Sequence, residues 1–169
     1  MSTRATYGFG KNRNGVEVTI YDHYDGYPEG AAIKFMRMID AASECRNASI
    51  ISPESFIRGN NNAEITHGNH GDTEFHYQLY GKTVEVRSRK AGDRVWTAFK
   101  KYGLVDFINA HGGKVAEVDG TIYTSMTAEC AIAQMQDLIQ HWDDNGVDAQ
   151  GQRESFQGVI IKLREEFDL

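Results

Sequence analysis

The amino-acid sequence predicts an α+β domain in which helices cover an antiparallel sheet of about five strands. Two observations indicate this class. Several short segments alternate apolar with polar residues, as half-buried strands do, whereas longer segments repeat apolar residues with the helical period. Their order along the chain, ββα(α)βββα(β)αα, groups strands with strands. A chain of 169 residues is long enough to bury a core, so residues 1–169 are expected to form a single domain.

The first expected elements are a hairpin and two helices. Residues 4–9 and 15–22 both alternate, and a polar loop with a glycine at each end joins them. Apolar residues then recur with the helical period over about 28–46, which predicts an amphipathic helix. Ser52-Pro53 is typical of a helix cap and first turn, so a second, short helix is expected to start there.

The middle of the chain is expected to hold one long loop, three strands and a short helix. Residues 59–72 are rich in Gly and Asn and predict an exposed loop. Alternation predicts strands at about 72–80 and 83–87, joined by a tight turn, and a third strand over 94–100. Residues 104–110 have the pattern of a short helix.

The last third of the chain is expected to be mostly helical. Residues 121–124 predict a short strand, and Thr127 is the expected N-cap of an amphipathic helix that ends near Asn145-Gly146. A final helix carries apolar residues on one face from Phe156 to Phe167. Because the connection between these two helices is short and polar, they are expected to pack antiparallel.

The composition excludes some classes of function. A net charge of −6 and a pI near 5.5 argue against non-specific binding to nucleic acid or to an anionic membrane. Cys45 and Cys130 both fall in apolar helical stripes and are expected to be small buried residues. The chain has no apolar run of 18 residues, and residues 1–4 lack the apolar part of a signal peptide. A cytoplasmic, reduced setting is therefore expected.

Residues 21–30 are the first candidate site, because chemically capable side chains are densest there. A strand, a tight turn at Asp25-Gly26 and a helix N-terminus meet in this segment, which we call the corner. Such a place can hold an anion or a partner's carboxylate, although turn and capping chemistry alone explains most of the same residues. The candidate binding residues are His23, Tyr24, Asp25, Tyr27 and Glu29 of the corner, with Asn61 and Asn69 of the 59–72 loop.

The second candidate is a cluster of three histidines and two carboxylates, His67, His70, Asp72, Glu74 and His76. Its composition suits Zn²⁺, Mn²⁺ or Ni²⁺. Its spacing matches no established metal motif, and a solvated strand face beside a polar loop explains the same residues. A divalent metal is the one cofactor that the sequence suggests. No catalytic residue is assigned, because His23 with its neighbouring carboxylates lacks a nucleophile.

Basic residues gather in a third segment, at Arg87, Arg89, Lys90, Arg94, Lys100 and Lys101, with Trp96 among them. In a chain of net negative charge this pattern is more typical of edge-strand protection than of a nucleic-acid groove. Nucleic acid is therefore not an expected partner.

Residues 3–40 resemble a known set of proteins. Thr3-Arg4-Ala5-Thr6 opens a strand, and His23-Tyr24-Asp25-Gly26-Tyr27-Pro28 precedes the first helix. This pattern is similar to that of small uncharacterised bacterial and phage proteins, which carry a Thr-Arg-x-Thr strand and an aromatic-Asp-Gly-Tyr-Pro turn. The resemblance implies a phage or mobile-element protein in a bacterial host cell. It also implies action by binding, as an inhibitor of a host protein such as a defence component.

Two other functions stay open from the sequence. One is a metal-dependent hydrolase or nucleotide-processing enzyme that uses the cluster from His67 to His76. The other is a protein that sequesters a nucleotide or another anion at the corner. Self-association into a homo-oligomer is also left open.

Overall fold

The computed structural model describes residues 3–11, 15–43, 51–67 and 70–169. Its contacts divide the chain into two compact units, Met1–Gly113 (unit 1) and Lys114–Leu169 (unit 2), and each is described by itself. The expectation of a single domain stays a prediction. In the described part of the chain, no helix has both the length and the apolar character needed to cross a membrane.

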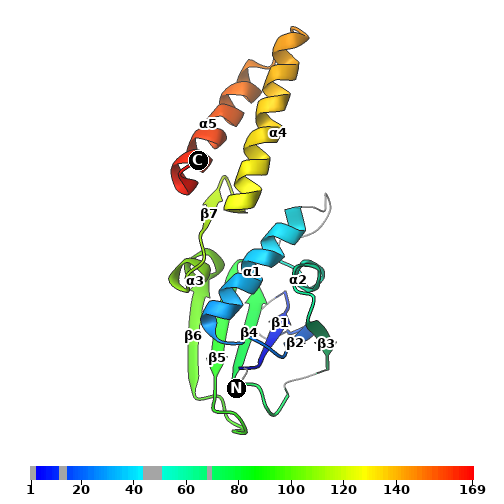
Figure 1. The fold of residues 1–169 in the computed structure, drawn as a ribbon, viewed down its shortest axis with the longest axis vertical. Helices are drawn as coiled ribbons and strands as arrows, with labels where there is room; N and C mark the ends of the chain where they lie inside the picture. Colours follow the sequence, from blue (N-terminus) through cyan, green and yellow to red (C-terminus); the bar gives the residue numbers. More distant parts are fainter. Residues whose placement is uncertain (1–2, 12–14, 44–50, 68–69) are drawn as a thin grey trace. The chain divides into compact units, whose positions relative to one another are not determined.

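Unit 1 is built on a six-stranded sheet with the order β3-β2-β1-β4-β5-β6 (Figure 1). The strands are β1 (Ala5–Phe9), β2 (Val18–Asp22), β3 (Ala63–Thr66), β4 (Phe75–Tyr80), β5 (Thr83–Ser88) and β6 (Ala98–Gly103). Neighbours are antiparallel except β1 and β4, which run parallel. The fold class α+β is confirmed, but the sheet is mixed and larger than expected. The reason is that β2 occupies one edge of β1. The chain then passes through helices to β3, which pairs with β2, and β4 pairs with the other edge of β1.

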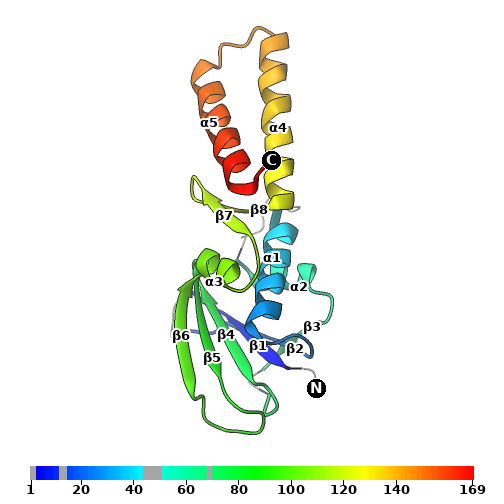
Figure 2. The ribbon, with the colours of Figure 1, turned by 60° about the vertical axis from the view of Figure 1, so that its left-hand side comes forward.

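Three helices cover one face of this sheet: α1 (Pro28–Ser43), α2 (Pro53–Gly59) and α3 (Leu104–Ala110) (Figures 1 and 2). Aromatic rings fill the space between them and the sheet. The fully buried ones are Tyr7, Phe35, Phe56, Tyr77 and Phe107. Their ring centroids lie 4.5 to 6.2 Å apart, within the range of favourable aromatic packing. This core fixes the sheet positions from which the site residues project.

Unit 2 holds a two-stranded sheet and a helical hairpin. Its elements are β7 (Val115–Val118), β8 (Thr121–Thr124), α4 (Ser125–Asp144) and α5 (Gln150–Phe167). The two helices run antiparallel, as expected (Figure 2). The N-cap of α4 is Thr124, three residues before the expected Thr127. The hydroxyls of Thr124 and Thr127 both cap the helix, because each accepts the backbone N–H of the other residue in a reciprocal capping box.

Some sequence expectations are wrong in detail. The predicted loop 59–72 contains β3, a four-residue strand whose alternation is too short to stand out. β7 was not expected, and β6 begins at Ala98, later than predicted. Cys130 is exposed on α4, because it lies outside the narrow stripe that a two-helix hairpin buries. Cys45 lies outside the described residues.

Candidate functional site

The corner is held by a buried ion pair between β2 and α1. The Lys34 Nζ lies 3.0 Å from a carboxylate oxygen of Asp22, and both side chains are almost completely buried. Asp22 also accepts the backbone N–H of Tyr24 at 3.0 Å, while Lys34 donates to the Tyr24 carbonyl at 2.9 Å. Two paired side chains therefore fix the backbone of Tyr24, whose ring is 56% exposed.

The turn at Asp25-Gly26 has its special backbone conformation at the aspartate and its tight packing at the glycine. Glycine is the residue that most easily adopts a left-handed backbone, yet in the turn predicted at Asp25-Gly26 that backbone is found at Asp25, with φ of 50°. Gly26 is instead required by close approach, because a Cβ there would lie 2.7 Å from the Arg4 carbonyl carbon. Its carbonyl accepts a 2.8 Å hydrogen bond from the buried Tyr77 hydroxyl. These contacts tie the corner to β1 and β4.

Four rings connect the corner with the loop before β4. Successive ring centroids lie 6.2 Å apart from Tyr24 to His23, 4.5 Å from His23 to Tyr21, and 4.0 Å from Tyr21 to His70, with the last pair stacked. We call Tyr21, His23, Tyr24 and His70 the tyrosine–histidine cluster. The structure thus brings together residues from both candidate sites, which the sequence treats as separate.

Polar groups surround Tyr21, the buried ring of this cluster, and its neighbour His70. The Tyr21 hydroxyl donates to Asp72 at 3.3 Å, and Asp72 also forms an ion pair with Arg4. Burial, followed by the negative charge of Asp72, raises the pKa of the Tyr21 hydroxyl. The His70 ring hydrogen-bonds the Thr66 hydroxyl through Nε2 at 2.8 Å. Tyr21 and His70 are therefore held in place. The two ends of the ring series, Tyr24 and His70, are both exposed.

The remaining predicted binding residues are dispersed. The Tyr27 hydroxyl lies 3.4 Å from Asp25, and its side chain is partly exposed. Glu29 turns toward α3, where a carboxylate oxygen lies 4.0 Å from the His111 Nδ1. Asn61 is exposed in the turn before β3, and Asn69 lies outside the described residues.

The predicted metal ligands do not converge within the described part of the chain, where no group of three or more His, Cys, Asp or Glu side chains could hold an ion. His67 is exposed, and Glu74 lies directly before β4. His76 is buried on the sheet, with Nδ1 2.9 Å from the Thr6 hydroxyl. Burial, together with Arg87 and Arg89, lowers the pKa of His76 to about 4. The metal-dependent alternative stays a prediction based on composition.

Arg89 is a site residue that the sequence did not indicate. Its guanidinium donates to the carbonyl oxygens of His70 at 2.7 Å and Thr73 at 2.8 Å, and it lies 4.3 Å from the Trp96 ring. This arginine therefore anchors the loop that carries His70. The sequence pattern suggested only a basic strip, because nothing in the spacing connects residue 89 with residue 70.

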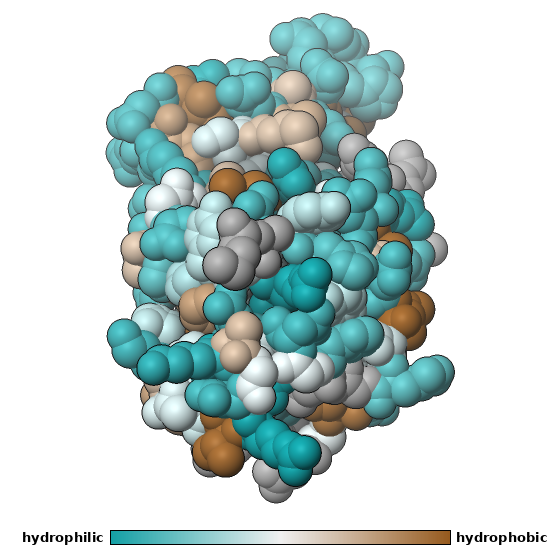
Figure 3. Space-filling model, turned by 60° about the horizontal axis from the view of Figure 1, so that its bottom comes forward, coloured by the Kyte–Doolittle hydropathy of each residue, from teal (hydrophilic) through white to brown (hydrophobic). Residues whose placement is uncertain are grey.

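In comparisons with protein-family models, curated proteins and solved structures, nothing matches the chain. The candidate site therefore depends on its own geometry. Figure 3 brings forward the end of unit 1 that carries the loops before β4 and β6. Hydrophilic residues dominate this surface, and apolar residues form separate small patches. Protein–protein interfaces that form reversibly are about as polar as the rest of the surface and are enriched in aromatic residues, so exposed rings on a polar surface are compatible with such an interface.

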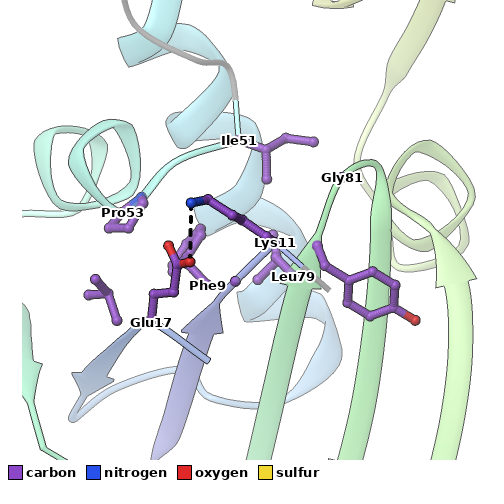
Figure 4. Close-up of a pocket in the computed structure, with 10 residues that line it drawn as sticks. Phe9, Lys11, Glu17, Ile51, Pro53, Leu79 and Gly81 are labelled. Atoms are coloured by element: carbon purple, nitrogen blue, oxygen red, sulfur yellow. Dashed lines mark ion pairs between the residues drawn. The ribbon is translucent and has the colours of Figure 1, made fainter. Parts of the chain in front are cut away.

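A cavity of about 190 Å³ lies at the other end of the sheet, where β1 and β4 end near the start of α2 (Figure 4). Phe9, Leu79 and Pro53 supply apolar walls. Lys11 and Glu17 lie on its polar side, with the Nζ 3.6 Å from a carboxylate oxygen. Because these two charges neutralise each other, the cavity offers no free charge to a ligand from this pair.

Proposed function

We propose that the chain acts by binding a protein partner through the tyrosine–histidine cluster, with Tyr24 as the principal contact. The observation that carries this proposal is the convergence of residues 21–24 with His70 and Asp72 into one fixed group that ends in an exposed ring. Aromatic side chains dominate the energetics of protein interfaces.

Preorganisation supports the same proposal. The Tyr24 backbone is held by Asp22 and Lys34, so only the side-chain torsions of Tyr24 remain to be ordered when a partner binds. Ordering a side chain at an interface otherwise costs about 0.5–1.5 kcal/mol. The polar surroundings suit a partner that dissociates and exists free in solution.

The resemblance of residues 3–40 supports the kind of partner. We propose a bacterial host protein such as a defence component, engaged by a phage or mobile-element protein inside the host cell. The proposal requires neither a cofactor nor a bound nucleic acid.

The test is capture from bacterial lysate with three purified forms of the chain: wild type, Tyr24→Ala and Phe99→Ala. Phe99 is a matched control, because it is an exposed aromatic residue on β6, the opposite edge strand of the sheet. A true partner is retained by wild type and by Phe99→Ala and is lost or strongly weakened with Tyr24→Ala. Truncation of an interface anchor costs about 2 kcal/mol or more, roughly thirtyfold in Kd.

Two results would contradict the proposal. One is the absence of any stoichiometric partner in repeated captures from several bacterial lysates. The other is a partner that Tyr24→Ala binds as tightly as wild type while the melting temperatures of both are equal.

A further inference from the structure

A second cavity, of about 240 Å³, lies in unit 1 between the start of α1, α3 and the strands β4, β5 and β6. Aromatic side chains form its walls. Tyr102 and Phe107 have ring centroids 5.6 Å apart, and Phe107 lies 4.7 Å from the His111 ring. Phe75 on β4 closes the cavity from the direction of the sheet centre. The interior is therefore suited to a flat ring.

One unpaired cation lines this apolar space. Lys100 pairs in register with Val86 on the helix-covered face of the sheet, where an apolar residue is normal. In the described ranges, no ion pair engages Lys100. The Glu29 carboxylate lies 4.0 Å from the Nδ1 of His111, which also lines the cavity. Pro28, the first residue of α1, also lines the cavity, so the positive end of that helix dipole adds to the charge of Lys100.

We propose that this cavity binds a small aromatic carboxylate, with its ring against Tyr102 and Phe107 and its carboxylate at Lys100. Drug-sized ligands occupy pockets of about 300–1,000 Å³, so a cavity of about 240 Å³ suits a ligand with a single ring. Lys100 is exposed at the cavity, so a carboxylate gains an ion pair there that a neutral ring does not. This site is separate from the tyrosine–histidine cluster and does not depend on the proposed protein partner.

The test is a titration followed by amide NMR, with three probes that separate ring from charge. Benzoate carries both, acetate carries the charge alone, and benzyl alcohol carries the ring alone. Benzoate is expected to bind saturably, with shifts at the amides of β6 and α3, and at least about tenfold more tightly than the other two probes. Equal binding of acetate and benzoate, or no saturable binding of benzoate up to about 10 mM, would overturn the proposal.

Two neighbouring lysines supply the matched variants. Lys100→Met is expected to weaken benzoate binding about tenfold, because it removes the charge and keeps an unbranched side chain. Lys101→Met is expected to leave the affinity unchanged, since alternation along β6 places Lys101 on the opposite face of the sheet, near the Tyr80 ring. Equal affinity in wild type and Lys100→Met would contradict the assignment.

A filling variant tests the position of the ring. Ala98 lines the cavity at the exposed edge strand, so Ala98→Phe adds a ring without removing any core side chain. Benzoate binding should be lost while the amide spectrum of β1 and β2 stays that of wild type. Undiminished binding would place the ligand elsewhere. Capture of a protein partner through Tyr24 should be unchanged in all three variants, so failure of either proposal is distinguishable from failure of the other.

Discussion

Tyr7 and Tyr77 stack on neighbouring strands in the core of unit 1, with ring centroids 5.3 Å apart, but their hydroxyls are in different situations. The Tyr77 hydroxyl donates to the Gly26 carbonyl. The Tyr7 hydroxyl is buried and has no hydrogen-bond partner among the residues that the structure describes. Burial raises the pKa of both hydroxyls, so both are neutral at physiological pH.

Removing the Tyr7 hydroxyl and removing the Tyr77 hydroxyl should therefore have different effects on the free energy of unfolding. Tyr7→Phe is expected to leave the free energy of unfolding unchanged or to raise it by about 1 kcal/mol, because it removes a desolvated group without opening a cavity. Tyr77→Phe should lower it by about 2 kcal/mol, since the Gly26 carbonyl loses its donor. Urea unfolding of both variants measures the difference. Similar losses in the two variants would show that Tyr7 has a hydrogen-bond partner in solution.

Substitution of Gly26 should destabilise the corner through a steric clash. In Gly26→Ala the new methyl group would lie within 2.8 Å of Arg4 and Ala5 backbone atoms, which cannot move without shifting β1. We expect a loss of about 2 kcal/mol or more in the free energy of unfolding, measured by urea titration.

Gly158→Ala is the matched control for that variant. Gly158 lies inside α5, and nothing approaches the position of its Cβ within 4 Å. Alanine should stabilise this helix by about 0.5–1 kcal/mol, because glycine is a poor helix former. A Gly26→Ala protein as stable as wild type would refute the close packing of the corner on β1.

The sequence predicted most elements of unit 1 but not how they pair. Residues of β1 and β4 alternate clearly, because one face of each strand packs in the aromatic core. That β4 joins β1 in parallel depends on contacts between residues about 70 positions apart, such as Thr6 with His76. Local pattern contains no information on that pairing. β3 escaped notice because four residues, one of them the exposed Ile65, show no strong alternation.

The same limit applies to the candidate site. Turn chemistry located the corner, and the density of histidines located the loop before β4. The stacking of Tyr21 on His70 joins β2 to a residue beyond β3, and no local sequence pattern indicates such a contact. Arg89 could not be assigned for the same reason, since it reaches His70 from the end of β5.

The ion pair between Lys34 and Asp22 should be a large single contribution to the stability of the corner. Lys34→Met leaves the Asp22 carboxylate buried without its cation, which is expected to cost about 3 kcal/mol in the free energy of unfolding. Adding Asp22→Asn should recover part of this loss, because the amide oxygen still accepts the Tyr24 N–H. The three proteins are compared by urea unfolding at neutral pH.

An exposed ion pair provides the control. Lys11 and Glu17 lie 3.6 Å apart with side chains 85% and 58% exposed, so Lys11→Met should change stability by less than about 0.5 kcal/mol. An equally small effect of Lys34→Met would mean that water reaches Asp22 in solution.

His76 should make the stability of unit 1 dependent on pH. Its pKa is lowered from 6.5 to about 4 in the folded chain, first by burial and then by Arg87 and Arg89. Between pH 4 and 6.5 the unfolded chain therefore binds more protons at this residue than the folded chain does. Stability must then fall as the pH is lowered through this window. From pH 8 to pH 5 the loss is about 2 kcal/mol.

The variant His76→Gln tests this dependence through its slope. Glutamine does not titrate, so the decrease in stability between pH 8 and pH 5 should shrink by about 2 kcal/mol, whatever the variant costs at neutral pH. His67→Gln is the matched control and should keep the wild-type slope, because His67 is exposed. Urea unfolding of the three proteins at several pH values gives the slopes. An unchanged slope in His76→Gln would mean that His76 is accessible to protons in the folded protein.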